Sequence, residues 1–103
     1  MSMTPAETLA FVDAMRAALS PAAKRVLGMM LAAEEADRYE DAEIIRDGRE
    51  VWVGEHRTNN RVLNDLLAGV LVHAEEPMGA KIERFTLNED GRAVAKAERN
   101  TKP

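Results

Sequence analysis

The sequence contains no cysteine, which excludes disulfide bonds and thiolate metal sites. Only four residues are aromatic, so we expect a core built mainly from leucine, valine, isoleucine, methionine and alanine. No apolar run approaches the roughly 18 residues needed to cross a bilayer, and Met1–Pro5 lacks the order of a signal peptide. We therefore expect a soluble, cytoplasmic protein with a single domain over residues 1–103.

The net charge of −4 is distributed unevenly along the chain. Residues 34–43, which we call the acidic run, hold six acids against one arginine, a net charge of −5 that leaves +1 for the rest. The acidic run allows three interpretations: a solvated helix end, a docking surface for a basic partner protein, or mimicry of a nucleic-acid backbone. The six acids are Glu34, Glu35, Asp37, Glu40, Asp41 and Glu43.

Two helices are predicted in the N-terminal third. Thr4, followed by a proline, can cap a helix over about residues 5–19. Ser20 and the next proline repeat the signal, and an apolar stripe predicts a second helix over about residues 21–36. The first helix is rich in alanine with a narrow apolar stripe, and we expect residues 5–19 to mediate a homodimer.

Residues 37–48 allow two interpretations. Ile44-Ile45-Arg46 is either a strand leading into a two-residue turn at Asp47-Gly48, or part of a short helix with an apolar residue at every third position. We favour the hairpin, because Val51-Trp52-Val53 has the composition of a partner strand. In that strand Trp52 points away from both valines, and we expect it in the core or in a subunit contact.

The clearest helix lies in the second half of the chain. Thr58 or Asn59 can cap it, and Gly69 can end it. Its apolar face would consist of Val62, Leu63, Leu66 and Leu67. The rest is predicted as a strand over 70–72, a polar loop over 75–80, a strand over 81–87, a helix over 89–99 capped by Asn88, and a loose tail over 100–103.

Residues 57–97 resemble the winged helix-turn-helix domains of bacterial transcriptional regulators. The shared features are a leucine pair closing a helix, a linker with Gly69, a short apolar strand, and the phrase Leu87-Asn88-Glu89-Asp90-Gly91-Arg92 opening the last helix. The resemblance implies an α+β fold, a small winged-helix-like domain. Its parts would be two N-terminal helices, a short hairpin, a recognition-type helix, a two-stranded wing and a C-terminal helix. The chain departs from the family at residues 49–54, where strand-like sequence replaces the helix before the recognition helix.

This resemblance implies a small DNA-binding transcriptional regulator that reads the major groove with the helix starting near Thr58. Arginine can bind guanine and asparagine can bind adenine in that groove, while a helix N-terminus favours phosphate. Arg46 and Arg49, which flank the predicted turn, could hold a phosphate between them. The candidate DNA-binding residues are Arg57, Thr58, Asn59, Asn60, Arg61, Asn64, and, in the wing, Lys81 and Arg84.

Catalysis has little support in the sequence. His56 and His73 stand apart without metal-ligand spacing, and the chain has no glycine-rich phosphate loop and no nucleophile elbow. We therefore expect no enzyme activity, no cofactor and no bound metal. Double-stranded DNA is the expected partner, bound by a homodimer because two half-sites compensate for a modest positive charge. The alternative is a non-enzymatic interaction module, or phage-type inhibitor, that binds a protein partner through the acidic run.

Overall fold

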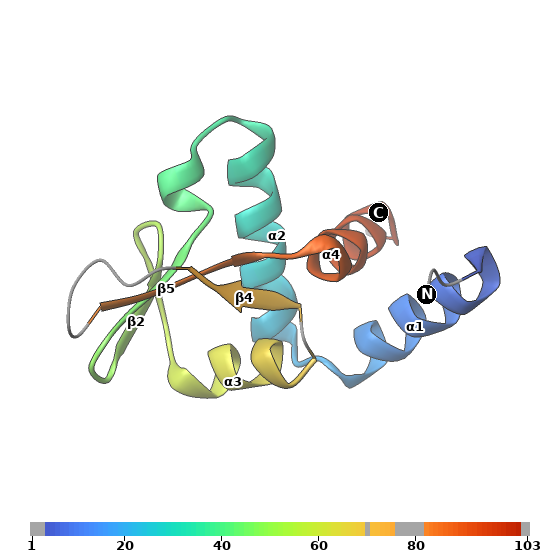
Figure 1. The fold of residues 1–103 in the computed structure, drawn as a ribbon, viewed down its shortest axis with the longest axis horizontal. Helices are drawn as coiled ribbons and strands as arrows, with labels where there is room; N and C mark the ends of the chain where they lie inside the picture. The colour runs from blue at the N-terminus through green and yellow to red at the C-terminus, as the bar shows by residue number, and fades with distance from the viewer. Residues whose placement is uncertain (1–3, 70, 76–81, 102–103) are drawn as a thin grey trace.

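The computed structural model describes residues 4–69, 71–75 and 82–101 of the chain. These residues form an α+β fold in which helices pack against an antiparallel sheet of five strands (Figure 1), which confirms the α+β part of the expected fold class. In chain order the elements are α1 (Pro5–Ala18), α2 (Pro21–Glu35), the 3-10 turn η1 (Tyr39–Asp41), β1 (Ile44–Asp47), β2 (Glu50–Val53), β3 (His56–Thr58), α3 (Asn60–Ala68), β4 (Val72–Ala74), β5 (Ile82–Leu87) and α4 (Glu89–Thr101).

The first two helices begin where the sequence predicts. Thr4 Oγ1 accepts a hydrogen bond from the Glu7 amide at 3.2 Å, and Ser20 Oγ accepts one from the Ala23 amide at 3.1 Å. Each cap satisfies an amide that has no partner inside the helix. The proline that follows each cap lacks an amide hydrogen, so it fits a position where that hydrogen would go unbonded.

The segment after α2 forms the hairpin, and the helical alternative for residues 37–48 is wrong except for η1. Asp47 lies opposite Glu50, so the two-residue turn is Gly48-Arg49 and not Asp47-Gly48. Gly48 has a φ of 61°, which suits the first central position of a type II′ turn. The predicted register is therefore wrong by one residue. Two acids face each other beside the turn, whereas Arg46 lies opposite Val51.

The strand β3 was not predicted. It pairs with β2 so that Thr58 lies opposite Val51, and Thr58 therefore does not start the following helix. His56-Arg57-Thr58 lacks the alternation of apolar and polar residues that marks a half-buried strand. As a three-residue edge strand it is paired on one side only, and the backbone pairing with β2 suffices to form it.

The strand order is β3-β2-β1-β5-β4, and every neighbouring pair is antiparallel. The strand predicted over residues 70–72 is β4, which begins at Val72 and pairs with β5. Residue 70, most of the predicted loop over 75–80, and Lys81 lie outside the described residues. The strands β4 and β5 are the ones predicted as a wing. Because β5 also pairs with β1, they belong to the same sheet as the β1–β2 hairpin.

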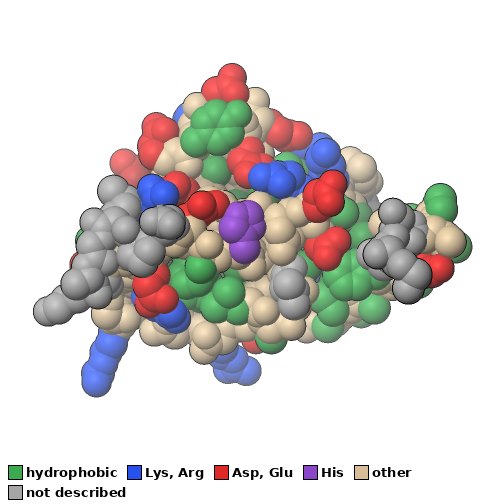
Figure 2. Space-filling view, in the orientation of Figure 1, with side chains coloured by type: hydrophobic (Ala, Val, Ile, Leu, Met, Phe, Trp, Pro, Cys, Tyr) green, Lys and Arg blue, Asp and Glu red, His purple; other side chains and the backbone are tan. Residues whose placement is uncertain are grey.

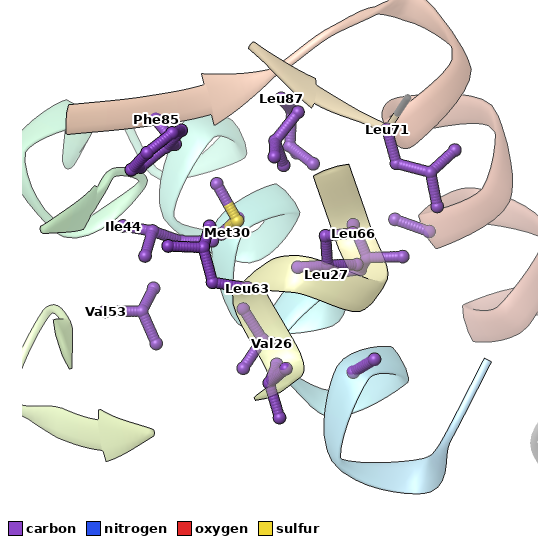
Figure 3. Packing of buried hydrophobic residues seen from close by; sticks show 14 of the residues in the cluster. Val26, Leu27, Met30, Ile44, Val53, Leu63, Leu66, Leu71, Phe85 and Leu87 are labelled. Carbon is purple, nitrogen blue, oxygen red and sulfur yellow. The ribbon is translucent and has the colours of Figure 1, made fainter. Parts of the chain in front are cut away.

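The core lies between the sheet and the helices α2 and α3. Helix α2 contacts β2 and β5, and α3 contacts β2 and β4. Ile44, Val53 and Phe85 are neighbours across three strands and are all buried. Figure 3 shows the helix side chains that meet them, among them Val26, Leu27, Met30, Leu63 and Leu66.

Trp52 points to the opposite face of the sheet from Val51 and Val53, as its position in the strand predicts. It is half-buried there and does not belong to the buried core. The guanidinium of Arg57 lies 5.8 Å from the centre of its ring. The core position expected for Trp52 is therefore wrong, and the subunit contact stays a prediction.

Helices α1 and α4 lie side by side and extend from the sheet toward one end of the molecule (Figure 1). Arg16 of α1 donates from Nε to Glu98 of α4 at 2.9 Å. Within α1 only Val12 is buried. In the part of the chain that is described, every helix is too short or too polar to cross a membrane.

Candidate nucleic-acid interface

Helix α3, the predicted recognition helix, begins at Asn60 because Asn59 satisfies its first turn. Asn59 Oδ1 accepts a hydrogen bond from the Val62 amide at 3.0 Å. Gly69 follows the last helical residue, as predicted, and its amide donates to the Asp65 carbonyl at 3.1 Å. Of the two predicted caps, Asn59 is therefore the one that acts.

One side of α3 is buried and the other is exposed. The exposed side, which we call the α3 stripe, contains Arg61, Asn64 and Ala68. Their spacing of three and four residues places them above one another on one helix face. The stripe presents a guanidinium and an amide to solvent. Asn60, a predicted DNA-binding residue, is half-buried instead and accepts a hydrogen bond from Arg46. The opposite side consists of the buried Val62, Leu63 and Leu66 and the partly buried Leu67.

Arg46, a predicted phosphate contact, is bonded to side chains around it. Its Nε and Nη2 donate to the two carboxylate oxygens of Glu83 at 2.9 and 2.8 Å, and its Nη1 donates to Asn60 Oδ1 at 3.3 Å. The guanidinium also lies 5.3 Å from the centre of the Phe85 ring. Hydrogen bonding between the two charged groups raises the pKa of Arg46 and lowers the pKa of Glu83. Arg46 therefore links β1 and β5 to the first residue of α3.

Arg57 and Thr58 were expected together beside a phosphate, but they lie on opposite faces of β3. Thr58 is half-buried on the side of the sheet that α2 and α3 cover, opposite Val51. Arg57 is exposed on the other side, over Trp52. Arg57 therefore lies on the face of the sheet away from α3, and the structure brings together only part of the predicted site.

The other predicted cations have different surroundings. Arg49 is exposed at the tip of the β1–β2 hairpin, between the exposed acids Asp47 and Glu50. Arg84 lies on the outer face of the sheet and pairs with Glu43 at 3.5 Å, while its buried Nε has no hydrogen-bond partner among the described residues. Lys81 lies outside those residues. Arg49 is therefore the better placed of these cations to meet an external anion.

Most of the acidic run is bonded within the protein. Glu34 receives two hydrogen bonds from Arg92 of α4 at 2.9 and 3.0 Å, which raises the pKa of Arg92. Glu35 pairs with Arg99, Asp41 pairs with Arg38 at 3.2 Å, and Glu43 pairs with Arg84. Asp37 accepts a hydrogen bond from the Tyr39 hydroxyl at 3.2 Å. The run therefore presents much less free charge than its sequence indicates.

The acidic run and α3 lie at opposite ends of the molecule. Figure 1 shows η1 and the end of α2 at the top of the view and α3 at the bottom. In Figure 2, acidic side chains gather around the upper end, whereas Lys and Arg side chains project from the lower edge. Among the ion pairs of the described residues, none involves Arg49, Arg57 or Arg61.

A cleft of about 470 Å³ lies beside the α3 stripe, where the starts of α2 and α3 come together. Ser20 lines it from the start of α2, and Asn59 and Arg61 line it from the start of α3. Both helices direct the positive ends of their dipoles toward this region, and Arg61 adds a full charge. Asp65 also lines the cleft and offsets part of that charge. The formal charges of Arg61 and Asp65 cancel, so the helix dipoles leave the cleft only weakly positive.

A polar cluster on β4 and β5 was not predicted. His73 Nε2 lies 2.9 Å from Glu75 Oε1 and 3.0 Å from Thr86 Oγ1, and Thr86 donates to the same Glu75 oxygen at 2.8 Å. Hydrogen bonds from Thr86 and then from His73 lower the pKa of Glu75. Both neighbours meet one ring nitrogen, so the imidazole does not bridge them through its two nitrogens as it does in a catalytic triad. Within the described ranges, no three His, Asp or Glu side chains could hold a metal ion.

Comparison of the chain with protein-family models, with curated proteins and with solved structures gives no match in any of the three. The fold and the site together define a small α+β protein whose third helix turns one polar face to solvent, away from the paired acids.

Proposed function

We propose that the chain is a small DNA-binding module of winged-helix type, and that α3 enters the major groove. The observation that carries this proposal is the α3 stripe. Arg61 and Asn64 stand exposed on one helix face, backed by a buried apolar face, at the end of the molecule farthest from the acidic run. A recognition helix needs this combination of a rigid base and free polar side chains.

The connectivity of the second half supports the winged-helix type. Strand β1 lies beside the β4–β5 hairpin, and α3 connects the two parts of the sheet. The hairpin strands β2 and β3 occupy the place of the helix that normally precedes a recognition helix. We infer that this chain is a variant in which that helix has been replaced by two strands, so α3 would approach DNA without a helical neighbour on that side.

Four of the six positions in the phrase shared with winged-helix regulators have a structural reason. Leu87 is fully buried, and Asn88 Oδ1 caps α4 by accepting the Gly91 amide at 2.8 Å. A β-carbon at Gly91 would lie 2.1 Å from the Leu71 carbonyl oxygen, so only glycine fits there. Arg92 then bonds Glu34 at the end of α2. The phrase seats the last helix against the linker that follows α3.

The side chains of the α3 stripe have the chemistry of base recognition. Arginine can donate two hydrogen bonds to guanine, and asparagine can both donate to and accept from adenine. Phosphate would be contacted by Arg49 at the hairpin tip and at the cleft beside Arg61. With so few unpaired cations and a net charge of −4, we expect weak binding that falls steeply with salt. Arg49 and Arg61 are two cations at the DNA, and two phosphate contacts would give a slope of roughly −2 in log K against log salt per protomer.

The proposal is tested by fluorescence anisotropy with a labelled random duplex at about 50 and 150 mM salt. Replacing Arg61 with alanine is expected to cost about 1–3 kcal/mol, a loss of roughly 5- to 150-fold in affinity. The matched control is Lys96→Ala on α4, which also removes one exposed cation that has no ion pair among the described residues.

Lys96→Ala should leave the affinity nearly unchanged, and Arg61→Lys should keep the salt dependence while lowering the preference among sequences. Equal losses for the Arg61 and Lys96 variants would mean that binding follows net charge alone. Absence of binding at 50 mM salt would contradict the proposal outright.

A further inference from the structure

Helix α1 is apolar on nearly every side and yet is covered on only one side. Ten of the residues from 5 to 18 are proline, alanine or larger apolar residues, and they occur all around the helix. Only Val12 is buried, and Leu9 is 65% exposed. Figure 2 shows hydrophobic side chains exposed over α1 on the right of the view. A helix that is apolar all round normally lies inside a protein, so α1 has the composition of a helix covered by a second surface.

An apolar groove of about 310 Å³ runs between α2 and α4. Gly28, Met29 and Ala32 from α2 and Ala95 from α4 line its floor. Gly28 and Ala32 are exposed, and a β-carbon added at Gly28 would meet nothing within 4 Å. Small side chains of this kind let another helix approach the backbone closely.

The charged residues that line the groove sum to a net positive charge, whereas those of α1 sum to a net negative charge. Lys24 and Arg25 stand at the groove, and neither takes part in an ion pair within the described part of the chain. On α1, Glu7 is exposed, and Asp13, whose side chain is 73% exposed, lies 3.9 Å from Arg16 of the same helix. A partner carrying α1 therefore brings two acids toward two unpaired cations.

The groove and α1 are neighbours on the surface of one protomer. Arg16 of α1 bonds Glu98 of α4, and Glu98 also lines the groove. A surface that places a donor helix beside an acceptor groove can pair with itself around a two-fold axis, because each copy then gives and receives the same contact.

We propose that the occupant of the groove is α1 of a second copy of this chain. Leu9 of each protomer lies over Gly28 and Ala32 of the other, and the acids of α1 lie near Lys24 and Arg25. The result is a two-fold dimer in which the α1, α2 and α4 helices of both copies pack together. This proposal does not rest on DNA binding, since none of its residues belongs to the α3 stripe.

Sedimentation equilibrium of the full chain between about 1 and 200 µM tests the proposal, with dimer dissociation as the readout. Leu9→Gln removes the anchor, and Gly28→Leu fills the groove with a side chain that the free protomer has room for. Each is expected to raise the dimer dissociation constant by about 30-fold or more, the loss typical of a central interface residue. Circular dichroism should show both variants folded.

The control is Tyr39→Ser, since Tyr39 is the other large hydrophobic residue that is strongly exposed among those described, at 61%, and it lies in η1. It should leave the dissociation constant unchanged. Reversing Arg25 to glutamate should weaken the dimer, and adding Asp13→Lys should restore at least half of the loss in free energy. A monomer at 200 µM would overturn the proposal. A dimer that Leu9→Gln and Gly28→Leu leave intact would overturn it equally.

Discussion

At the end of the molecule formed by η1 and the C-terminal part of α2, charged side chains are bonded to one another, whereas at the α3 end several are not. Glu34 and Glu35 reach Arg92 and Arg99 across 58 and 64 residues of sequence. Arg61, by contrast, has no ion pair in the described residues. The segment that looks most charged in the sequence is therefore the one where charge mainly holds the fold together. Free charge suited to binding lies elsewhere.

The largest expected effect comes from displacing α4, whose Arg92 and Arg99 pair with two acids of the acidic run. Gly91→Ala places a β-carbon 2.1 Å from the Leu71 carbonyl oxygen, and we expect the free energy of unfolding to fall by about 4 kcal/mol. Urea denaturation at low protein concentration measures it. Gly28→Ala, where the added carbon meets no atom within 4 Å, should instead raise stability by about 1 kcal/mol. Equal effects of the two substitutions would show that α4 does not abut Leu71.

The next effect concerns the base of the α3 end. Leu66 is fully buried, and Leu66→Ala should lower the free energy of unfolding by about 3 kcal/mol because it leaves a cavity under α3. Ala68→Gly, on the exposed side of the same helix, should cost only about 1 kcal/mol through helix propensity. Thermal and urea unfolding distinguish the two, and a Leu66 variant as stable as the wild type would mean that α3 is turned the other way.

A smaller effect is expected at Arg46, which bonds Glu83 of the sheet and Asn60 of α3. Hydrogen bonds from Arg46 lower the pKa of Glu83 below its ordinary value of 4.5. The contact therefore stabilises the fold above that value, and its contribution is lost as the pH falls through the lowered pKa. Melting temperatures from pH 7 to pH 3 should show Glu83→Gln less stable than the wild type near neutrality, with the difference closing in acid. Glu40→Gln is the control, and a constant gap would contradict the assignment.

The smallest effect is expected at the end of the molecule formed by η1 and the C-terminal part of α2, which we call the paired end. Asp37 there adopts a φ of 58° after α2. The Arg38 amide donates to the Ala33 carbonyl at 2.8 Å and the Asp37 amide to the Glu34 carbonyl at 3.1 Å, a helix-closing pattern that favours glycine at this position. Asp37→Gly should raise the free energy of unfolding by about 0.5 kcal/mol. Asp37→Ala should lower it, because alanine keeps the strain and removes the carboxylate that accepts a hydrogen bond from the Tyr39 hydroxyl. If both variants lose stability, the bond from Tyr39 outweighs the strain.

Much of the fold could be predicted from local patterns. Capping residues and apolar spacing predicted α1, α2, α3 and α4 to within about two residues, and the alternation around Trp52 predicted which way its side chain points. These features depend on neighbours in sequence. The predicted apolar face of α3 was correct for the same reason, since Val62, Leu63 and Leu66 are buried and Leu67 is partly buried.

The predictions that were wrong concern features that depend on contacts between distant residues or on the detailed geometry of a turn. The three polar residues of β3 have no apolar pattern that predicts a strand, because this edge strand is formed by backbone pairing with β2. The turn slipped by one residue because Asp47-Gly48 and Gly48-Arg49 both place glycine where φ is positive. The bond between Arg46 and Glu83 joins residues 37 apart in sequence, so Arg46 was assigned to a ligand instead of to the fold.

The most direct test of the α3 surface is an amide NMR titration of the full chain with a random duplex at about 50 mM salt. If α3 meets DNA, the largest shifts should occur at Arg61 and Asn64, with smaller shifts at the hairpin tip around Arg49. Residues 37–41 of the paired end should stay unchanged, because their charge is already bonded or repelled by phosphate. Shifts concentrated on residues 37–41, or on the sheet face around Trp52, would contradict the account.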